Sequence, residues 1–246
     1  MQVLILAAGY GTRLYPLTKN TPKPLLPCNH KPIINYLLDK VKNFSGLSEI
    51  IVITNDKFYV HFKDWAETLK GFPASIKVLN DGTTSPEDRL GAMGDIDFAL
   101  KRNKVAEDLL VMGGDNLFNY SLDSYITFSK RNAPKATIGL YDIKETVLAL
   151  NFGVVQLDHK KKIISFEEKP KTPKSTLIAM CLYYLSKDSL HSVSDYLRET
   201  KRSDTTGDYI NWLSMRDTVY GFKFEGKWYD IGSIEAYEEA QQDFKS

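Results

Sequence analysis

The sequence predicts an α/β fold built on a mostly parallel sheet with helices on both faces. Three short, largely apolar runs, at 3–8, 49–53 and 108–112, are typical of strands that are covered on both sides, and a further strand is expected at 75–79. Segments with apolar residues at a helical period lie between these runs. Strands that alternate with helices favour a parallel, right-handed, doubly wound sheet. Ligands bind such sheets beyond the carboxyl ends of the strands, so we expect the functional site there.

The helices of the first half have recognisable signals. Pro32 suits the start of a helix, because its missing N–H has no partner there in any case. The residues after it place apolar side chains on one face. We expect helices at 32–41, 58–69 and 90–101, with a loop at 80–88.

The second half changes character. Residues 152–157 and 163–166 flank a polar turn and predict a β-hairpin. Further on we expect a strand at about 177–185, a helix near 187–200, extended segments at 219–224 and 227–230, and a closing helix at 234–244. No linker, repeat or low-complexity tract divides the chain. We therefore expect a single domain over 1–246, with a lid-like second half.

Composition narrows the class of protein. The chain has 246 residues, a net charge of +1, 43% hydrophobic and 26% charged residues, which favours a globular protein without a general attraction to nucleic acid or membranes. No apolar run reaches the ~18–20 residues that span a bilayer. The N-terminus has no basic signal-peptide region. Cys28 and Cys181 lack metal-ligand spacing and are expected to be free thiols. We expect a cytoplasmic protein with neither nucleic acid nor membrane as a partner.

The first strand runs into a glycine-rich loop, in the stretch LILAAGYGTRLYPLTKNTPKPLLP. Gly9 and Gly11 allow backbone N–H groups to approach phosphate, while Arg13 offers a planar fork and Lys23 a point charge. A dinucleotide fingerprint is excluded because Leu14 takes the place of its third glycine. A P-loop is excluded because neither glycine is followed by lysine. The loop is therefore predicted to bind phosphate in another way.

Four ordered motifs resemble those of the sugar-1-phosphate nucleotidyltransferases, also called nucleoside-diphosphate-sugar pyrophosphorylases. They are Leu6–Leu14 with Pro22–Leu25, Phe152–Val155, Glu167–Pro170 with Pro173–Ser175, and Trp228–Ser233. The third is most similar to its form in glucose-1-phosphate thymidylyltransferases. The resemblance covers nearly the whole chain. It implies a Rossmann-like, glycosyltransferase-A-like nucleotidyltransferase fold, with a nucleotide-binding half at 1–120 and a sugar-phosphate-binding half at 121–246.

The resemblance also implies a reaction, in which a nucleoside triphosphate (NTP) and a sugar-1-phosphate give a nucleoside-diphosphate (NDP) sugar and pyrophosphate. The sugar phosphate attacks the α-phosphorus in line, so no nucleophilic side chain is needed. Two unit charges ~4 Å apart repel by ~4 kcal/mol at an effective dielectric of 20, so cations must surround the phosphates. The resemblance gives Arg13, Lys23 and Lys169 as catalytic cations. It gives Asp115 and Asp230 as ligands of Mg²⁺.

Substrate contacts follow from the same resemblance. Those implied for the nucleotide are Leu6, Ala8, Gly9, Gly11, Thr12, Arg13, Lys23, Gly91 and Asp115. Those implied for the sugar phosphate are Gly153, Glu168, Lys169 and Tyr183. Gly153 would let the sugar lie against the backbone, Glu168 would accept hydrogen bonds from sugar hydroxyls, and Gly91 would place its backbone near the base.

The sequence departs from the family in three places. In the loop at 80–95 the Gln or Glu that usually reads the base is absent or displaced, and Pro86 and Glu87 occupy that region. Cys181 stands where glycine is usual and could reshape the sugar pocket. The chain ends soon after Asp230, so we expect neither the added C-terminal helices of longer thymidylyltransferases nor an acyltransferase domain.

These departures leave alternatives open. We favour dTTP or UTP as the nucleotide, but a cytidylyl- or guanylyltransferase, or one acting on a phosphorylated non-sugar, is an alternative. A non-catalytic sugar-nucleotide sensor is another, although a sensor would be expected to lose phosphate or metal residues. This sequence keeps all five phosphate- and metal-binding residues that the resemblance implies: Arg13, Lys23, Asp115, Lys169 and Asp230. The sugar and the oligomeric state, a homo-oligomer included, stay open.

Overall fold

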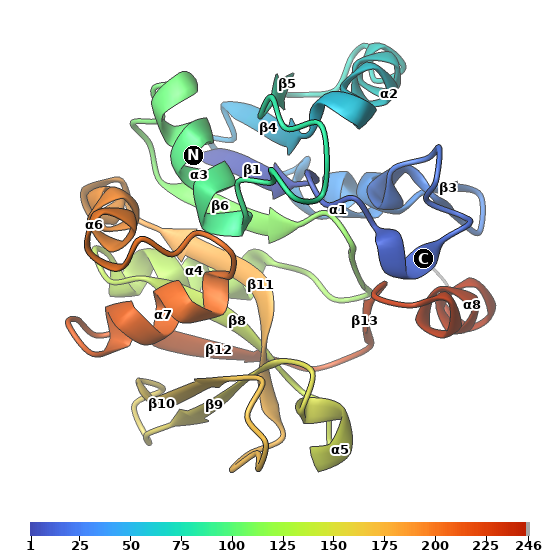
Figure 1. The fold of residues 1–246 in the computed structure, drawn as a ribbon. Helices are drawn as coiled ribbons and strands as arrows, with labels where there is room; N and C mark the ends of the chain where they lie inside the picture. The colour runs from blue at the N-terminus through green and yellow to red at the C-terminus, as the bar shows by residue number, and fades with distance from the viewer. Residues whose placement is uncertain (245–246) are drawn as a thin grey trace.

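The computed structural model describes residues 1–244 and confirms a mixed, mostly parallel sheet flanked by helices (Figure 1). Nine of the described strands form one sheet, in the order β10-β9-β11-β6-β1-β4-β5, with β8 beside β11 and β12 beside β8. Their bounds are β1 (Gln2–Leu6), β4 (Glu49–Thr54), β5 (Ser75–Asn80), β6 (Leu109–Gly113), β8 (Thr137–Asp142), β9 (Gly153–Leu157), β10 (Ile163–Glu168), β11 (Leu177–Leu185) and β12 (Tyr220–Phe224).

The four strands that the first half contributes to the main sheet, β1, β4, β5 and β6, are parallel, as predicted. β1 lies between β4 and β6, with Leu6 opposite both Ile53 and Gly113. The carboxyl ends of β1 and β6 therefore meet at one edge, where the N–H of Gly114 donates to the carbonyl of Leu6 at 2.9 Å. This register brings the glycine-rich loop beside Asp115.

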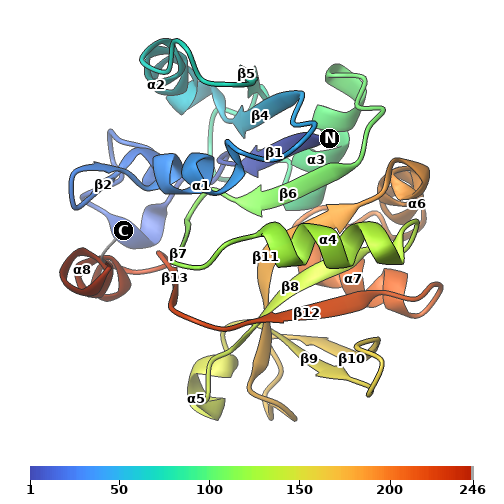
Figure 2. The ribbon, with the colours of Figure 1, turned by 180° about the vertical axis from the view of Figure 1, so that it is seen from behind.

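Three helices cover each face of the sheet (Figures 1 and 2). On one face lie α3 (Ala92–Arg102), α6 (His191–Thr200) and α7 (Thr206–Ser214), and on the other α1 (Ile33–Val41), α2 (Asp56–Glu67) and α4 (Asp123–Asn132). Each face has its own apolar core, and burial of each large apolar side chain contributes about 1.5–3 kcal/mol. No helix within the described residues has the length and apolar character needed to cross a membrane.

A third core joins the C-terminal segment to the N-terminal loop. Helix α8 (Ile234–Asp243) packs beside Leu14, Leu26 and Cys28, close to the short strands β2 (Pro27–Cys28) and β3 (Lys31–Pro32). The preceding strand β13 (Trp228–Asp230) pairs antiparallel with β7 (Asn116–Phe118). These contacts hold the C-terminal part of the described chain against the N-terminal loop that contains Leu14 and Leu26.

The second half extends the same sheet, because β11 pairs antiparallel with β6. The sequence reading left α4, β8, α7 and the short helix α5 (Thr146–Ala149) unassigned. Glycines weaken the local signals of β8 and α7. In β8, a Cβ on Gly139 would lie 2.8 Å from Leu182, so packing excludes the larger side chains that usually mark a strand.

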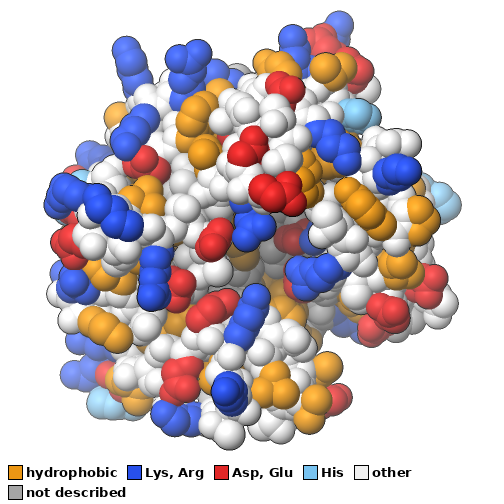
Figure 3. Space-filling model, in the orientation of Figure 1, with side chains coloured by type: hydrophobic (Ala, Val, Ile, Leu, Met, Phe, Trp, Pro, Cys, Tyr) orange, Lys and Arg blue, Asp and Glu red, His pale blue; other side chains and the backbone are white. Residues whose placement is uncertain are grey.

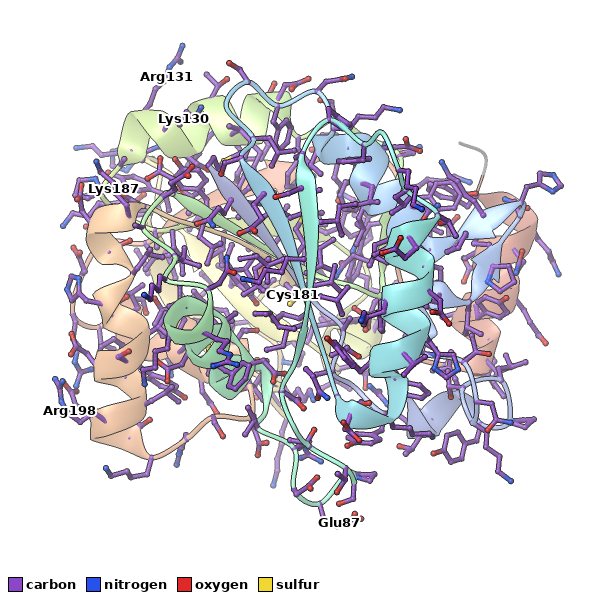
Figure 4. The ribbon with its side chains drawn as sticks, turned by 90° about the horizontal axis from the view of Figure 1, so that it is seen from above. Glu87, Lys130, Arg131, Cys181, Lys187 and Arg198 are labelled. Carbon is purple, nitrogen blue, oxygen red and sulfur yellow. The ribbon has the colours of Figure 1, made fainter. Side chains whose placement is uncertain are left out.

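β11 changes its neighbour in mid-strand. Ile178 pairs with β9, whereas Leu182 pairs with β6, and the pairing with β8 is irregular between Ala179 and Tyr183. Cys181 lies within this irregular stretch and has a φ of +45°, which residues other than glycine rarely adopt. It occupies the middle of the molecule (Figure 4). Residues of this stretch line a cavity together with Asp115, which follows β6, and Gly153, which begins β9.

We predict that Gly91→Ala destabilises the protein, because a Cβ there would lie 2.5 Å from the carbonyl oxygen of Ser203. Gly91 also has a φ of +78°. Gly46→Ala is the matched control, since Gly46 has a φ of +76° and no atom within 4 Å of a built Cβ. Urea unfolding should show Gly91→Ala less stable than Gly46→Ala by about 1–3 kcal/mol. Equal stability of the two variants would contradict the close packing of Gly91.

Candidate functional site

Three adjoining cavities form one cleft beyond the carboxyl ends of β1 and β6. The β1–α3 cavity, about 190 Å³, is lined by Leu6, Ala8, Gly9, Asp81, Arg89, Gly91, Ala92, Asp95 and Asp204. The loop cavity, about 320 Å³, includes Gly9, Gly11, Arg13, Lys23 and Asp115 in its wall. The β9–α7 cavity, about 340 Å³, includes Gly153, Glu168, Lys169, Tyr183 and Asp230. Figure 3 shows the cleft as a hollow with charged side chains around it.

The loop cavity has a wall of free backbone donors. Among the described residues, the peptide N–H groups of residues 8–13 have no hydrogen-bond acceptor. Gly11 turns the loop with a φ of +63°, and the hydroxyl of Thr18 donates to its carbonyl at 2.6 Å. Successive N–H groups around such a turn form a concave site for an anion. The structure thus brings Gly9, Gly11 and Thr12 to one wall, as the sequence predicted.

Two cations of the loop have different surroundings. Arg13 is exposed and makes no hydrogen bond or ion pair with another described residue, so its guanidinium is available to a ligand. Lys23 Nζ lies 2.8 Å from Asp115 Oδ2, with side chains 13% and 31% exposed. Withdrawal of Asp115 from water would raise its pKa, but the charge and hydrogen bond of Lys23 outweigh this and hold the pKa below its usual value. Asp115 is therefore ionised at neutral pH.

The pairing of β7 with β13 brings Asp230 to Asp115. Asp230 lies opposite Asn116 in the register of these strands, and the N–H of Ile231 donates to the carbonyl of Asp115 at 3.2 Å. The buried Asn116 helps to hold these two strands together, because its Oδ1 accepts a hydrogen bond from the indole N–H of Trp228 at 2.6 Å. The sequence reading did not assign a role to Asn116, although it adjoins the Gly-Gly-Asp motif.

The two carboxylates oppose each other electrostatically. Burial and then the charge of Asp115 raise the pKa of Asp230 to about 6, against the lowering effect of Lys23, Arg13 and Lys169. No cluster of three or more His, Cys, Asp or Glu side chains within residues 1–244 could hold a metal. Two carboxylates beside an anion site nevertheless fit Mg²⁺, which takes one or two carboxylates and completes its octahedron with phosphate oxygens and water.

Glycines make room for Glu168 in the β9–α7 cavity. A Cβ on Gly153 would lie 3.0 Å from Glu168 Oε2, and a Cβ on Gly207 would overlap the same oxygen. The carboxylate of Glu168 makes no hydrogen bond or ion pair with another described residue, and burial raises its pKa. It is therefore held in place by packing and free to accept hydrogen bonds. The sequence reading missed Gly207, because no local pattern connects it with Glu168.

The remaining predicted residues of this cavity differ in availability. Lys169 is exposed, has a φ of +45° and makes no ion pair with a described residue. Tyr183 lines the cavity, but its hydroxyl bonds with the Thr206 hydroxyl at 2.8 Å. Burial raises the pKa of Tyr183 well above its usual value, so the hydroxyl stays neutral. Tyr183 therefore also holds the first turn of α7.

The β1–α3 cavity contains residues that the sequence reading did not select. Glu87, from the region where a base-reading residue is usual, is exposed at the outer end of its loop (Figure 4). Asp81 and Asp95 line the cavity instead. Gly91 also lines this cavity, but its missing side chain makes room for the backbone of Ser203. The carbonyl of Ser203 accepts a hydrogen bond from the N–H of Met93 at 2.8 Å.

Comparison with known proteins places this geometry in context. The family described as nucleotidyl transferase matches residues 2–246. The bifunctional protein GlmU of Methanocaldococcus jannaschii is 31% identical over 237 residues, which are 94% of this chain and 51% of that protein. GlmU of Methanococcus aeolicus is 30% identical over 238 residues, with the same coverage of 94% and 51%. The chain thus spans about half the length of the curated relatives it matches.

Solved structures agree on the fold. One from Bacillus anthracis, described as a glucose-1-phosphate thymidylyltransferase in complex with sucrose, has a TM-score of 0.84 and 26% identity, and covers 100% of this chain and 97% of that chain. A UDP-glucose pyrophosphorylase complexed with UDP-glucose has a TM-score of 0.81 and 22% identity, and covers 98% and 97%. The second likeness shows the fold alone.

We predict that Asp230→Asn stabilises the metal-free protein at pH 7.5. Because the folded pKa of Asp230, about 6, exceeds its usual value of 3.8, ionised Asp230 destabilises the fold, and stability falls as pH rises from about 4 to 6. At 1.36 kcal/mol per pKa unit, the variant should gain up to about 3 kcal/mol at pH 7.5, and the gain should vanish below pH 4.

Thermal unfolding in the presence of a chelator measures this difference. The exposed Asp64 on α2 supplies the control Asp64→Asn, which should leave stability unchanged at both pH values. A loss of stability in Asp230→Asn at pH 7.5 would show that Asp230 is not repelled in the free cleft.

Proposed function

This chain belongs to the nucleotidyl transferase family, and we propose that it joins an NTP to a sugar-1-phosphate, releasing pyrophosphate and an NDP-sugar. The observation that carries the proposal is that the three cavities adjoin one another. The loop cavity shares Leu6 and Gly9 with the β1–α3 cavity and Arg13 and Asp115 with the β9–α7 cavity. The β1–α3 and β9–α7 cavities share Ala92 and Asp204. The base would occupy the β1–α3 cavity, the phosphates the loop cavity and the sugar phosphate the β9–α7 cavity.

The charged residues suit an in-line displacement at the α-phosphorus. An oxygen of the sugar phosphate attacks, the bond to the β-phosphate breaks, and pyrophosphate leaves with its electron pair. Arg13, Lys23 and the free N–H groups of residues 8–13 would stabilise the negative charge of the phosphates. Lys169 would hold the attacking phosphate from the other side of the cleft.

Asp115 and Asp230 would hold Mg²⁺ where the loop cavity meets the β9–α7 cavity. When bound, the ion neutralises charge on the reacting phosphates and helps to orient them. Lys23, which pairs with Asp115 in the free cleft, would then be free to turn to phosphate.

For the substrates, we favour dTTP or UTP and a glucose-1-phosphate-like sugar. The structure with 26% identity is described as a glucose-1-phosphate thymidylyltransferase, which supports this choice. Glu168 supplies the acceptor that sugar hydroxyls require, between two glycines that leave its oxygens accessible to a ligand.

We predict that pyrophosphate release from NTP and glucose-1-phosphate requires the cations and carboxylates of the cleft. Arg13→Ala, Lys23→Ala, Asp115→Asn and Asp230→Asn should each lower kcat by at least about 100-fold, because each removes a charge that acts on the transition state. A coupled pyrophosphate assay with a panel of NTPs measures the rates, and Asp64→Asn should match the unaltered protein. Full activity in either aspartate variant would contradict the metal assignment.

We predict further that Gly207→Ala impairs use of the sugar phosphate selectively. The added Cβ overlaps the carboxylate of Glu168 and must displace it. The KM for sugar-1-phosphate should rise about 10–100-fold, as expected for a misplaced contact, while the KM for NTP changes little. Ser214→Ala, at the other end of α7, is the control. An unchanged KM for the sugar phosphate would remove Glu168 from the proposed sugar contacts.

A further inference from the structure

We propose that Asp81 and Asp95 form a hydrogen-bonded carboxyl pair that reads the nucleobase and selects a ring N–H flanked by two carbonyls, as in uracil and thymine. The proposal rests on the proposed function and deepens it. It gives the base-reading role to a different pair of residues from the Gln or Glu that is usual in resembling sequences.

The pair comes from two elements that meet at the β1–α3 cavity. Asp81 follows β5 directly, and Asp95 lies in the first turn of α3. Asp81 is 8% exposed and Asp95 is 7% exposed, and both residues line the cavity. The N–H of Asp95 donates to the carbonyl of Gly91 at 2.8 Å. Asp95 and the cavity-lining Gly91 therefore lie together at the start of α3.

Hydrogen bonds give the two carboxyl groups different states. Asp81 Oδ1 accepts from the N–H of Thr83 at 2.7 Å and from its hydroxyl at 2.8 Å, so Asp81 is the anion of the pair. Asp81 Oδ2 and Asp95 Oδ1 are buried, and neither accepts a hydrogen bond from a donor group of a described residue. A side-chain hydrogen bond between the two carboxyl groups lowers the pKa of Asp81 and raises the pKa of Asp95, and a proton shared by these two buried oxygens would supply that bond. Burial and the charge of Asp81 raise the pKa of Asp95 to about 8, so Asp95 donates the proton.

Other charges around the pair leave this arrangement intact. Asp88 carries a negative charge near Asp81, and Arg89 lines the cavity but lies within 3.5 Å of Asp204 at the exposed rim. Tyr10 donates to the Thr83 hydroxyl at 3.4 Å, and burial raises its pKa, so it stays neutral. No cation among the described residues pairs with Asp81 or Asp95.

The cavity therefore presents an acceptor together with backbone donors. Asp95 Oδ2 has no hydrogen bond to a described residue and, unlike Oδ1, is not among the buried unpaired oxygens. The peptide N–H groups of Ala8 and Gly91, which also line the cavity, have no acceptor among the described residues. An acceptor and two donors in one cavity match the groups on the imide edge of uracil or thymine, where N3–H lies between two carbonyl oxygens.

Other bases would leave groups unpaired in this cavity. Cytosine presents its ring nitrogen N3 as an acceptor to Asp95 Oδ2, also an acceptor. Guanine has a suitable ring N–H, but its exocyclic amine would face a backbone donor. Adenine lacks the ring N–H. A site built around hydrogen bonds discriminates against ligands that leave its buried polar groups unpaired.

The test uses N3-methyl-UTP, which keeps the carbonyls of UTP but cannot donate from N3. With the unaltered protein, UTP or dTTP should exceed CTP, GTP and ATP in kcat/KM, and UTP should exceed N3-methyl-UTP by at least about 100-fold. In Asp95→Ala the preference for UTP over N3-methyl-UTP should fall below about tenfold. Asp95→Asn, whose amide oxygen still accepts, should retain more of the preference than Asp95→Ala. Asp64→Ala should leave it unchanged.

The outcomes separate the two proposals. Pyrophosphate release with CTP, GTP or ATP as the preferred nucleotide would overturn the carboxyl pair and keep the nucleotidyltransferase. Equal use of UTP and N3-methyl-UTP by the unaltered protein would also overturn the pair, and this measurement needs no variant to fold. Neither binding nor turnover of any NTP would overturn the proposed function and the pair together.

Discussion

The balance of charge around Asp115 is the constraint on which the rest of the candidate site depends. Asp115 is ionised because Lys23 lies 2.8 Å away, and its charge in turn raises the pKa of Asp230. Without cations, two carboxylates at this point would repel a triphosphate. Arg13 and Lys169, neither of which has an ion-pair partner among the described residues, supply positive charge to the cleft. The cleft is thus arranged for anions although the chain carries a net charge of only +1.

Glycines shape the cleft through packing as well as through backbone freedom. Gly153 and Gly207 both border the carboxylate of Glu168, and Gly91 admits the carbonyl of Ser203. Only Gly91 among the three has a positive φ. A side chain at any of these positions would alter the cavities without touching a charged group of the phosphate-binding loop. The precision of the site therefore depends on contacts between distant segments.

Sequence reasoning succeeded where the signals are local. The apolar runs gave the parallel strands, and the glycine-rich loop and Asp115 were expected at the strand ends because parallel strands end at one edge. It failed where structure depends on distant contacts. β8 and α7 carry glycines that only packing explains, and the pairing of Asp81 with Asp95 needs both side chains buried in one cavity. The positive φ of Cys181 follows from the change of partner along β11, which no local pattern predicts.

The pairing of β13 with β7 has a consequence for the order of events during synthesis. Asn116 and Trp228, which fix that pairing, are 112 residues apart in the chain. A ribosome makes all nine strands of the main sheet before it reaches Asp230. The nine strands therefore leave the ribosome before Asp230, while one carboxylate of the cleft is still missing. A nascent chain lacks the completed pair of aspartates until β13 has left the ribosome.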